Sequence, residues 1–368
     1  MNTIKVIDSH IHISNWTDAI DLNHEDYKQF ITPFKEIEKF GWSDATVTHN
    51  YKESVNAFIN SRNYDYVNVA CIPYVSGRDA SQNIMAALLK MDNKRVFAHG
   101  GFVYPDQPVT FPFKEGFEPH TQLEELIKIG FDGVKMLETH PKAKKVLKTD
   151  FTAKGFELLF KKLEEEQIHI LWHVNDPIEY WDDPANSDHP DREAVYGEVY
   201  EILRRHPKLK VTFAHMCYMT TQKERLEKLL DDYPNVFIDI TPGPSNFRNM
   251  SENVKAWREF FIKYSDRIMF GSDFSTRGGG YSIPNVYRFL VTDDSFKMAG
   301  MDVKGIALDK DTLDKILYRN FLKRVGEKPR EIDTEALSAY IRKYEHLLTN
   351  ETNRIPMLND CRKKGLYI

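Results

Sequence analysis

The feature that most constrains the fold is an alternation of short apolar runs with longer amphipathic segments along the chain. The runs are rich in Val, Ile and Phe, as expected for strands that are buried on both faces of a parallel sheet. Eight runs follow this pattern: Lys5–Ile13, Tyr66–Tyr74, Val96–Tyr104, Gly133–Leu137, Ile168–Val174, Val211–Cys217, Val236–Ile240 and Ile268–Phe274.

The segments between these runs carry helix signals. Thr121–Glu124 and Thr221–Glu224 match the capping box, in which a hydroxyl and a glutamate satisfy backbone N–H groups at a helix start. Gly130 stands where a C-terminal glycine belongs. Asp191–His206 and Thr152–Glu166 are amphipathic and long enough to be crossover helices.

Strands that alternate with helices indicate a parallel α/β sheet, and eight of them fit a closed (β/α)₈ barrel, the TIM barrel. An open doubly wound sheet is the rival fold, but its phosphate-binding glycine fingerprint does not follow the first strand. We therefore expect a barrel.

The chain has 368 residues, more than the roughly 250 of a simple barrel. Insertions are expected after strand one (14–62, with two helices) and after strand five (176–191), on the side where active-site loops lie. A C-terminal tail at 331–368 should form one helix and an irregular end. We expect a single domain over 1–368, with the barrel at about 4–326.

Composition excludes several classes of function. The chain is 41% apolar and 29% charged, with a net charge of -5, so neither nucleic acid nor an anionic membrane is an expected partner. Its three cysteines are widely spaced and form no disulfide framework. The N-terminus lacks a signal-peptide pattern, and no apolar run approaches the ~20 residues of a membrane span. We expect a cytoplasmic protein.

The strongest local motif is Asp8-Ser-His10-Ile-His12 at the end of the first predicted strand. Side chains two residues apart on a strand point to the same face, so His10 and His12 can grip one metal ion. The alternative is that two polar residues simply end a strand.

Three further polar residues end predicted strands: His173 the fifth, His215 the sixth and Asp273 the eighth. The carboxyl ends of barrel strands meet at one mouth, so these residues are expected to lie beside His10 and His12. Each residue alone also permits a structural explanation, but packing rarely requires five such side chains at these positions.

This pattern resembles the amidohydrolase superfamily, in particular the amidohydrolase-related branch that includes aminocarboxymuconate-semialdehyde decarboxylase. The resemblance runs from Ile4 to about Gly326. Beyond the histidines it includes Gly130-Phe-Asp-Gly-Val-Lys135 and the closing stretch Ile316-Leu-Tyr-Arg-Asn-Phe-Leu322. A TIM-barrel metal-dependent hydrolase is what the resemblance implies.

By this resemblance, His10, His12, His173 and Asp273 ligate a divalent metal, and His215 and Asp273 are the catalytic residues. Neutral imidazoles and a carboxylate suit Zn²⁺, and also Mn²⁺ or Fe²⁺; one ion is favoured over two. Asp273 can act as general base, while His215 can orient water, polarise a carbonyl or deliver a proton to carbon.

Two residues are candidates for substrate binding. Lys135 ends strand four and is either a carboxylated bridge between two metals, a point charge for a substrate carboxylate, or a structural lysine. Arg277 precedes three glycines and either clamps an anionic group or is an exposed loop residue.

The resemblance favours hydrolysis of an amide, ester or lactone of a small molecule, with decarboxylation of a small carboxylate as the alternative. The third interpretation is that the chain is a non-catalytic relative of these enzymes that acts as a binding protein. The resemblance also implies a homodimer.

Overall fold

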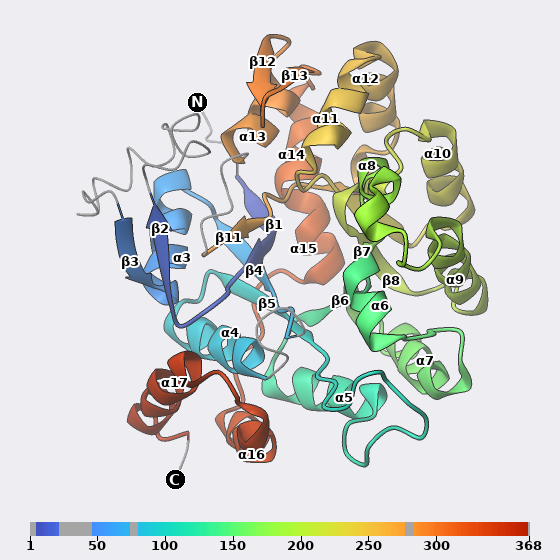
Figure 1. Ribbon diagram of the computed structural model, residues 1–368. Helices are drawn as coiled ribbons and strands as arrows, with labels where there is room; N and C mark the ends of the chain where they lie inside the picture. The colour runs from blue at the N-terminus through green and yellow to red at the C-terminus, as the bar shows by residue number, and fades with distance from the viewer. Residues whose placement is uncertain (1–4, 22–45, 74–79, 277–282, 367–368) are drawn as a thin grey trace.

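The computed structural model describes residues 5–21, 46–73, 80–276 and 283–366 and shows a parallel sheet ringed by helices (Figure 1). Its nine strands follow the spatial order β10-β9-β8-β7-β6-β5-β4-β1-β11. They are β1 (Ile7–His12), β4 (Tyr66–Ala70), β5 (Val96–Gly101), β6 (Gly133–Thr139), β7 (His169–Val174), β8 (Lys210–Phe213), β9 (Val236–Asp239), β10 (Ile268–Met269) and β11 (Phe274–Ser275). All eight predicted runs form strands, and the barrel prediction is confirmed.

The barrel closes through the eighth run, whose two halves are β10 and β11. β10 pairs with β9, and β11 pairs in parallel with β1. Between them, Ser9 N donates to Phe270 O (3.0 Å) and Asp273 N donates to His10 O (2.9 Å). A Cβ on Gly271 would lie 2.6 Å from Thr241 Cγ2, so only glycine lets the last strand approach this closely.

Helices cover the outside of the sheet, and the core lies between the two layers. Trp172 of β7, fully buried, stacks on Phe160 with ring centroids 5.7 Å apart. The covering helices are α4 (Ser81–Asp92), α5 (Pro119–Ile129), α7 (Glu157–Glu165), α9 (Arg192–Arg205), α10 (Lys223–Asp232), α12 (Val254–Lys263), α13 (Ile283–Val291), α14 (Lys310–Asp314) and α15 (Asn320–Val325). None of the described helices is long and apolar enough to cross a membrane.

Helix ends agree with the sequence only in part. Gly130 ends α5 with a left-handed φ of 110°, as expected, and α9 begins at the predicted position, capped by Asp191. The prediction of capping boxes at Thr121–Glu124 and Thr221–Glu224 is wrong, because neither α5 nor α10 has a hydrogen bond from a side-chain cap. In α5 the reason is that the helix already begins at Pro119, before Thr121. Proline is favourable at a first helical position because its missing N–H would have no partner within the helix there.

The two insertions lie after β1 and β7. The first contains an antiparallel pair, β2 (Thr17–Asp21) and β3 (Thr46–Asn50), followed by α3 (Tyr51–Arg62). It therefore holds one helix in its described part, and the second expected helix falls on residues 22–45, outside the described residues. The second insertion contains the short α8 (Ile178–Asp182) and a 3₁₀ turn.

The C-terminal tail forms two helices rather than the expected one. They are α16 (Thr334–Tyr344) and α17 (Glu351–Lys363). Asn350 caps α17 by accepting from Thr352 N, so the segment that was expected to be irregular is a helix, with Pro356 in its interior. Tyr344 Oη donates to Glu125 Oε2 on α5 (3.0 Å), so the tail is bonded to the barrel helices.

A buried ion pair adds to this attachment. Lys90 Nζ on α4 lies 2.5 Å from Asp132 Oδ2, and both side chains are almost fully enclosed. Asp132 also accepts from the backbone N–H groups of Ala98 and Arg330, each at 2.8 Å. Burial lowers the pKa of Lys90 and raises that of Asp132, so each charge depends on the other.

Replacing Asp132 with Ala should lower the free energy of unfolding by about 3–5 kcal/mol, because the Lys90 ammonium is left buried without its counter-ion. Urea denaturation measures this loss. Lys228→Ala is the control: it breaks an exposed pair with Asp232 and should change nothing measurable. A loss below about 1 kcal/mol for Asp132→Ala would contradict the role given to the pair.

Candidate metal centre

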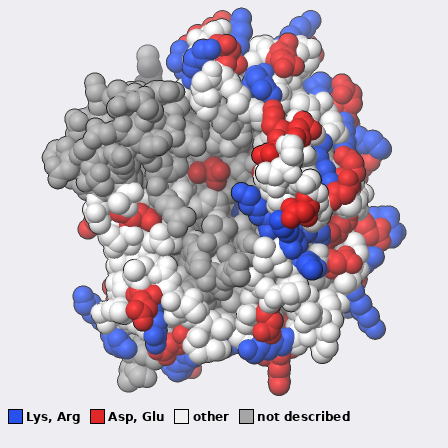
Figure 2. Space-filling view, viewed as in Figure 1, with Lys and Arg blue, Asp and Glu red and all other residues white. Residues whose placement is uncertain are grey.

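Three of the predicted residues form a compact cluster at the carboxyl ends of the strands. His10 Nε2 lies 3.1 Å from His12 Nε2, and Asp273 Oδ1 lies 3.2 Å from His12 Nε2 and 3.8 Å from His10 Nε2. The ligand atoms of all three residues lie within 4.8 Å of one another. Figure 2 shows acidic atoms inside a hollow at the centre of the molecular face.

Hydrogen bonds determine which nitrogen of each cluster imidazole carries its proton. His10 Nδ1 lies 2.9 Å from a carboxylate oxygen of Asp239, and His12 Nδ1 lies 2.7 Å from the carbonyl oxygen of Ala70. Both partners can only accept, so Nδ1 donates in both rings. Each Nε2 therefore keeps its lone pair.

The same reasoning applies to His173 and His215. His173 Nε2 donates to the carbonyl oxygen of Asn175 (2.8 Å), which leaves the lone pair on Nδ1. The hydroxyl of Thr241 donates to Asp239, so its oxygen accepts from His215 Nδ1 (2.9 Å). His215 therefore keeps its lone pair on Nε2.

This arrangement fits a cation. The lone pairs of His10 and His12 face each other at 3.1 Å beside the Asp273 carboxylate, an arrangement that is repulsive by itself and that positive charge stabilises. The Lys135 ammonium, which donates to His10 Nε2, supplies one such charge, and a metal ion would supply more. Burial lowers the pKa of His10 to about 3 and holds those of His173 and His215 below their usual range, so the rings are neutral. Neutral imidazoles are the form that binds metal.

Asp273 remains ionised beside these rings. Its enclosed position alone would raise its pKa, but the close approach of the His12, His10 and His215 rings holds the pKa well below its usual range. Asp273 has a positive φ of 54° in the break between β10 and β11, and its side chain is one-third exposed. A carboxylate that is ionised and open to the mouth can serve as ligand or base.

Asp239 is the residue that the sequence analysis missed. It ends β9, is fully buried, and accepts from His10 Nδ1, His215 N (2.8 Å) and the backbone and hydroxyl of Thr241. Burial would raise its pKa, but His10, His215 and Thr241 lower it to about 2. The signal was available: Asp239 ends an apolar run just as His215 and Asp273 do.

An unusual backbone turn presents His215. His215, Met216, Cys217 and Tyr218 all have positive φ, between 49° and 56°, and none of them is glycine. Each residue in this left-handed region costs roughly 1–2 kcal/mol, a cost that persists only where surrounding contacts impose it. Here Tyr218 stacks on the His215 ring (centroids 5.1 Å apart) and Tyr196 Oη donates to Cys217 O (2.7 Å).

His173 lies next to the cluster without joining it. Its ring is 4.9 Å from His215, while its Nε2 belongs to a second group with His140 and Asp176. That second group suits a metal poorly, since His173 Nε2 and His140 Nε2 both carry protons: His140 Nδ1 already accepts from Lys142 N. His173 can therefore offer Nδ1 alone.

The two predicted substrate-binding residues have different outcomes. Lys135 is buried on β6, and its ammonium donates to His10 Nε2 at 3.1 Å; burial lowers its pKa to about 8. Arg277 lies outside the described residues.

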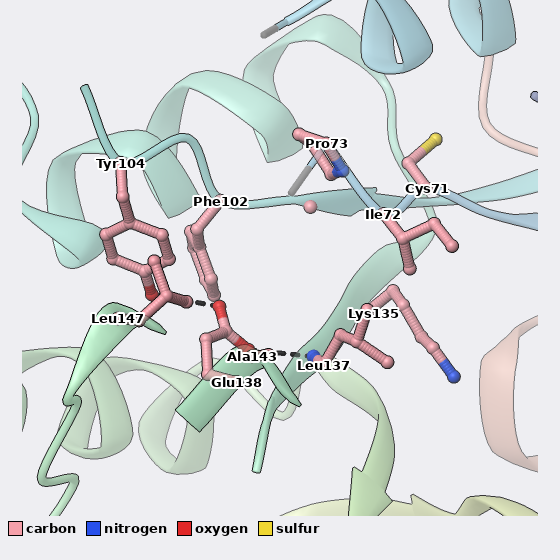
Figure 3. Close-up of a pocket in the computed structure, with 11 residues that line it drawn as sticks. Cys71, Ile72, Pro73, Phe102, Tyr104, Lys135, Leu137, Glu138, Ala143 and Leu147 are labelled. Carbon is pink, nitrogen blue, oxygen red and sulfur yellow. Dashed lines mark hydrogen bonds between the residues drawn. The ribbon is translucent and has the colours of Figure 1, made fainter. Parts of the chain in front are cut away.

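A small pocket lies beside Lys135, between the carboxyl ends of β4, β5 and β6. Figure 3 shows the lysine ammonium directed away from Glu138, whose carboxyl meets the Tyr104 hydroxyl. Tyr104 Oη donates to Glu138 Oε1 (2.9 Å) and Leu137 N donates to Oε2 (2.8 Å). Burial raises the pKa of Glu138, so the pocket combines apolar walls with one buried acid.

A family model described as amidohydrolase matches residues 7–321. The chain belongs to this family. The match spans the whole barrel and agrees with the resemblance inferred from the strand-end residues. Members of the amidohydrolase superfamily are enzymes that typically use a divalent metal, and the His10–His12–Asp273 group of this amidohydrolase has suitable ligands.

Proteins of known structure with the same fold include enzymes named for different reactions. A probable 2-pyrone-4,6-dicarboxylic acid hydrolase from Acinetobacter baumannii has a TM-score of 0.52 and 13% identity, covering 87% of this chain and 99% of its own. A 4-oxalomesaconate hydratase from Rhodopseudomonas palustris has a TM-score of 0.51 and 14% identity, and the match covers 93% of this chain and 99% of the hydratase. A 2,6-dihydroxybenzoate decarboxylase has a TM-score of 0.51 and 11% identity, and the match covers 88% of this chain and 99% of the decarboxylase. No curated protein matches the sequence.

Replacing Asp239 with Asn should weaken divalent-metal binding by about 10–100-fold. If the new amide keeps its oxygen on His215 N, its NH₂ group faces His10 Nδ1. His10 must then move its proton to Nε2, where it blocks a ligand position. Competition with a chelating dye measures the affinity.

Asp302→Asn, an exposed change, is the control and should bind metal like the wild type. Circular dichroism checks that both variants fold. Unchanged metal affinity in a folded Asp239→Asn protein would contradict the positioning role of Asp239.

Proposed function

We propose that this amidohydrolase is a metal-dependent hydrolase that adds water to an amide, ester or lactone carbonyl of a small molecule. The observation that carries the proposal is the tautomer of His215. Its Nδ1 proton is committed to Thr241, so Nε2 is a hydrogen-bond acceptor whose ring lies 5.5 Å from His10. An acceptor at this point suits a residue that orients water, which hydrolysis needs and decarboxylation does not.

His10, His12, His173 and Asp273 are the proposed ligands of one divalent ion, with Zn²⁺ preferred over Mn²⁺ or Fe²⁺. The support for this set is that all four side chains keep a lone pair that could face a metal. The one on His10 Nε2 accepts from the Lys135 ammonium and would exchange that bond for the metal. A metal bound there would lower the pKa of a water molecule and polarise the substrate carbonyl.

The protein's own groups then have distinct roles in the proposal. Asp273 takes a proton from the attacking water, while His215 Nε2 accepts a hydrogen bond from the same water and orients it. The water oxygen bonds to the carbonyl carbon, the C–N or C–O bond breaks, and Asp273 returns the proton to the leaving amine or alcohol. Asp239 keeps His10 and His215 in the required tautomers.

Lys135 is the proposed contact for a charged part of the substrate. A lysine ammonium can meet a substrate carboxylate as a point charge. Lys135 as a carboxylated bridge between two metals is the competing proposal. Arg277 remains a proposed anion clamp, and the homodimer, the single domain and the cytoplasmic location remain predictions.

Decarboxylation of a small carboxylate is the second candidate, supported by the fold shared with a dihydroxybenzoate decarboxylase. In that reaction a proton must reach carbon as carbon dioxide leaves. His215 Nε2 would first have to gain a proton, which the tautomer does not favour. Product analysis separates the two candidates: hydrolysis takes up water and releases an acid, whereas decarboxylation releases carbon dioxide.

Metal content per chain tests the proposed ligand set. Protein purified without chelators should contain about one ion, His12→Ala should lose it, and Lys135→Ala should keep it. Elemental analysis gives these numbers. Full occupancy in a folded His12→Ala protein would contradict the ligand set, and two ions that fall in Lys135→Ala would establish the bridge instead.

Replacing Asp273 with Asn should lower kcat at least about 100-fold, because the amide cannot take the proton from water. The melting temperature should change little, since the side chain is partly exposed. Turnover of a panel of small amides, esters and lactones measures the rate, with Asp302→Asn as the matched control. Near-normal turnover would remove Asp273 from the proposed mechanism.

A further inference from the structure

A cleft lies at the opposite end of the barrel from the metal centre, where strands β9 and β10 begin. It has a volume of about 390 Å³ and is lined by Asn235, Lys263, Arg267, Lys323 and Arg324, among others. These residues come from the loop before β9, the end of α12, the loop before β10, and α15. The cleft is therefore remote from His10 and His12.

Four of its lining residues are cations and only one, Asp266, is an acid. Asp266 has a highly exposed side chain and lies 3.5 Å from Lys315. Two of the cations have partners of their own: Lys263 lies 3.3 Å from Asp231, and Arg267 Nη1 donates to carbonyl oxygens at the end of α10. The other two, Lys323 and Arg324, define the chemistry of the cleft.

Arg324 is buried without a counter-ion. Its residue is only 7% exposed, and its Nη2 donates to the carbonyl oxygens of Val211 and Asn235. Its guanidinium carbon lies 4.3 Å from the centroid of the Phe237 ring. Its Nε is enclosed and has no hydrogen-bond partner.

Among the described residues, none supplies a carboxylate within ion-pair distance of Arg324. Burial lowers the pKa of Arg324, with no offsetting negative charge. Lys210, whose pKa is lowered by burial and by Arg324, adds positive charge nearby. A buried guanidinium with an unpaired N–H is costly unless a ligand completes it.

We propose that this cleft binds the phosphate group of a small phosphate monoester. Arg324 lines the cleft with a planar guanidinium that has no counter-ion, and Lys323 supplies a second positive charge from the same helix. The volume leaves room beyond a phosphate group, and Tyr264 in the lining offers an apolar surface for the esterified part. Because the cleft is distant from the metal centre, a ligand there would act as an effector or stabilising ligand and not as the substrate.

Calorimetric titration at constant ionic strength tests the proposal, with inorganic phosphate and phenyl phosphate as probes. Both should bind the wild-type protein, with phenyl phosphate at least as tight as phosphate. Lys323→Ala and Arg324→Lys should each weaken binding about tenfold, the loss expected for one charge-assisted hydrogen bond. Lys304→Ala, which removes an equally exposed charge elsewhere, should bind as the wild type does.

His10→Ala distinguishes this cleft from the metal centre. Phosphate binding that survives His10→Ala and weakens in Lys323→Ala supports the cleft, even if Arg324→Lys does not fold. Binding that is lost in His10→Ala but unchanged in Lys323→Ala would place the anion at the metal and overturn the proposal. Absence of binding, or exclusion of phenyl phosphate, would also overturn it.

Discussion

The closure of the sheet between its first and last strands is the constraint on which the rest of the structure depends. Parallel strands can form a closed barrel only if the eighth strand reaches the first, and here the backbone bonds between Ser9 and Phe270 and between Asp273 and His10 complete it. Gly271 makes the approach possible because a side chain there would collide with Thr241 and His10. Closure thereby brings Asp273 to the two histidines of β1.

Within the closed barrel, one carboxylate organises the polar groups. Asp239 is fully buried and would be unfavourable there by itself. It is satisfied by hydrogen bonds from His10, His215 and Thr241, which also determine the tautomer of each ring. The chemistry of the mouth thus depends on a residue that need not touch metal or substrate, as is common around metal sites.

The fold and much of the site were predictable because both follow from local patterns. Apolar runs identify buried strands, and strand ends in a barrel converge, which located His10, His12 and Asp273 correctly near one another. Asp239 was missed because its neighbours, Phe237 and Ile238, made the run look like core. The second tail helix was missed because its segment lacks a clear amphipathic periodicity and carries Pro356 in its interior.

Other features depend on contacts that no local pattern encodes. The left-handed turn from His215 to Tyr218 contains no glycine that would have predicted it. Ring stacking on Tyr218 and hydrogen bonds from distant residues, such as Tyr196 to Cys217 O, stabilise it. The separation of His173 from the cluster depends on its bond to Asn175 O, a matter of ring orientation. The buried charge of Arg324 is equally invisible in sequence, since burial of an arginine is a tertiary property.

The junction of β1 with the last strand also has a consequence for biosynthesis. His10 and His12 leave the ribosome well before Asp273, which follows more than 250 positions later. The nascent chain therefore carries the two histidines through more than 250 positions of translation without their carboxylate partner. The cluster is complete only once Asp273 has been added and the last strand has reached β1, so any ion captured earlier would be held by an incomplete and weaker set of ligands.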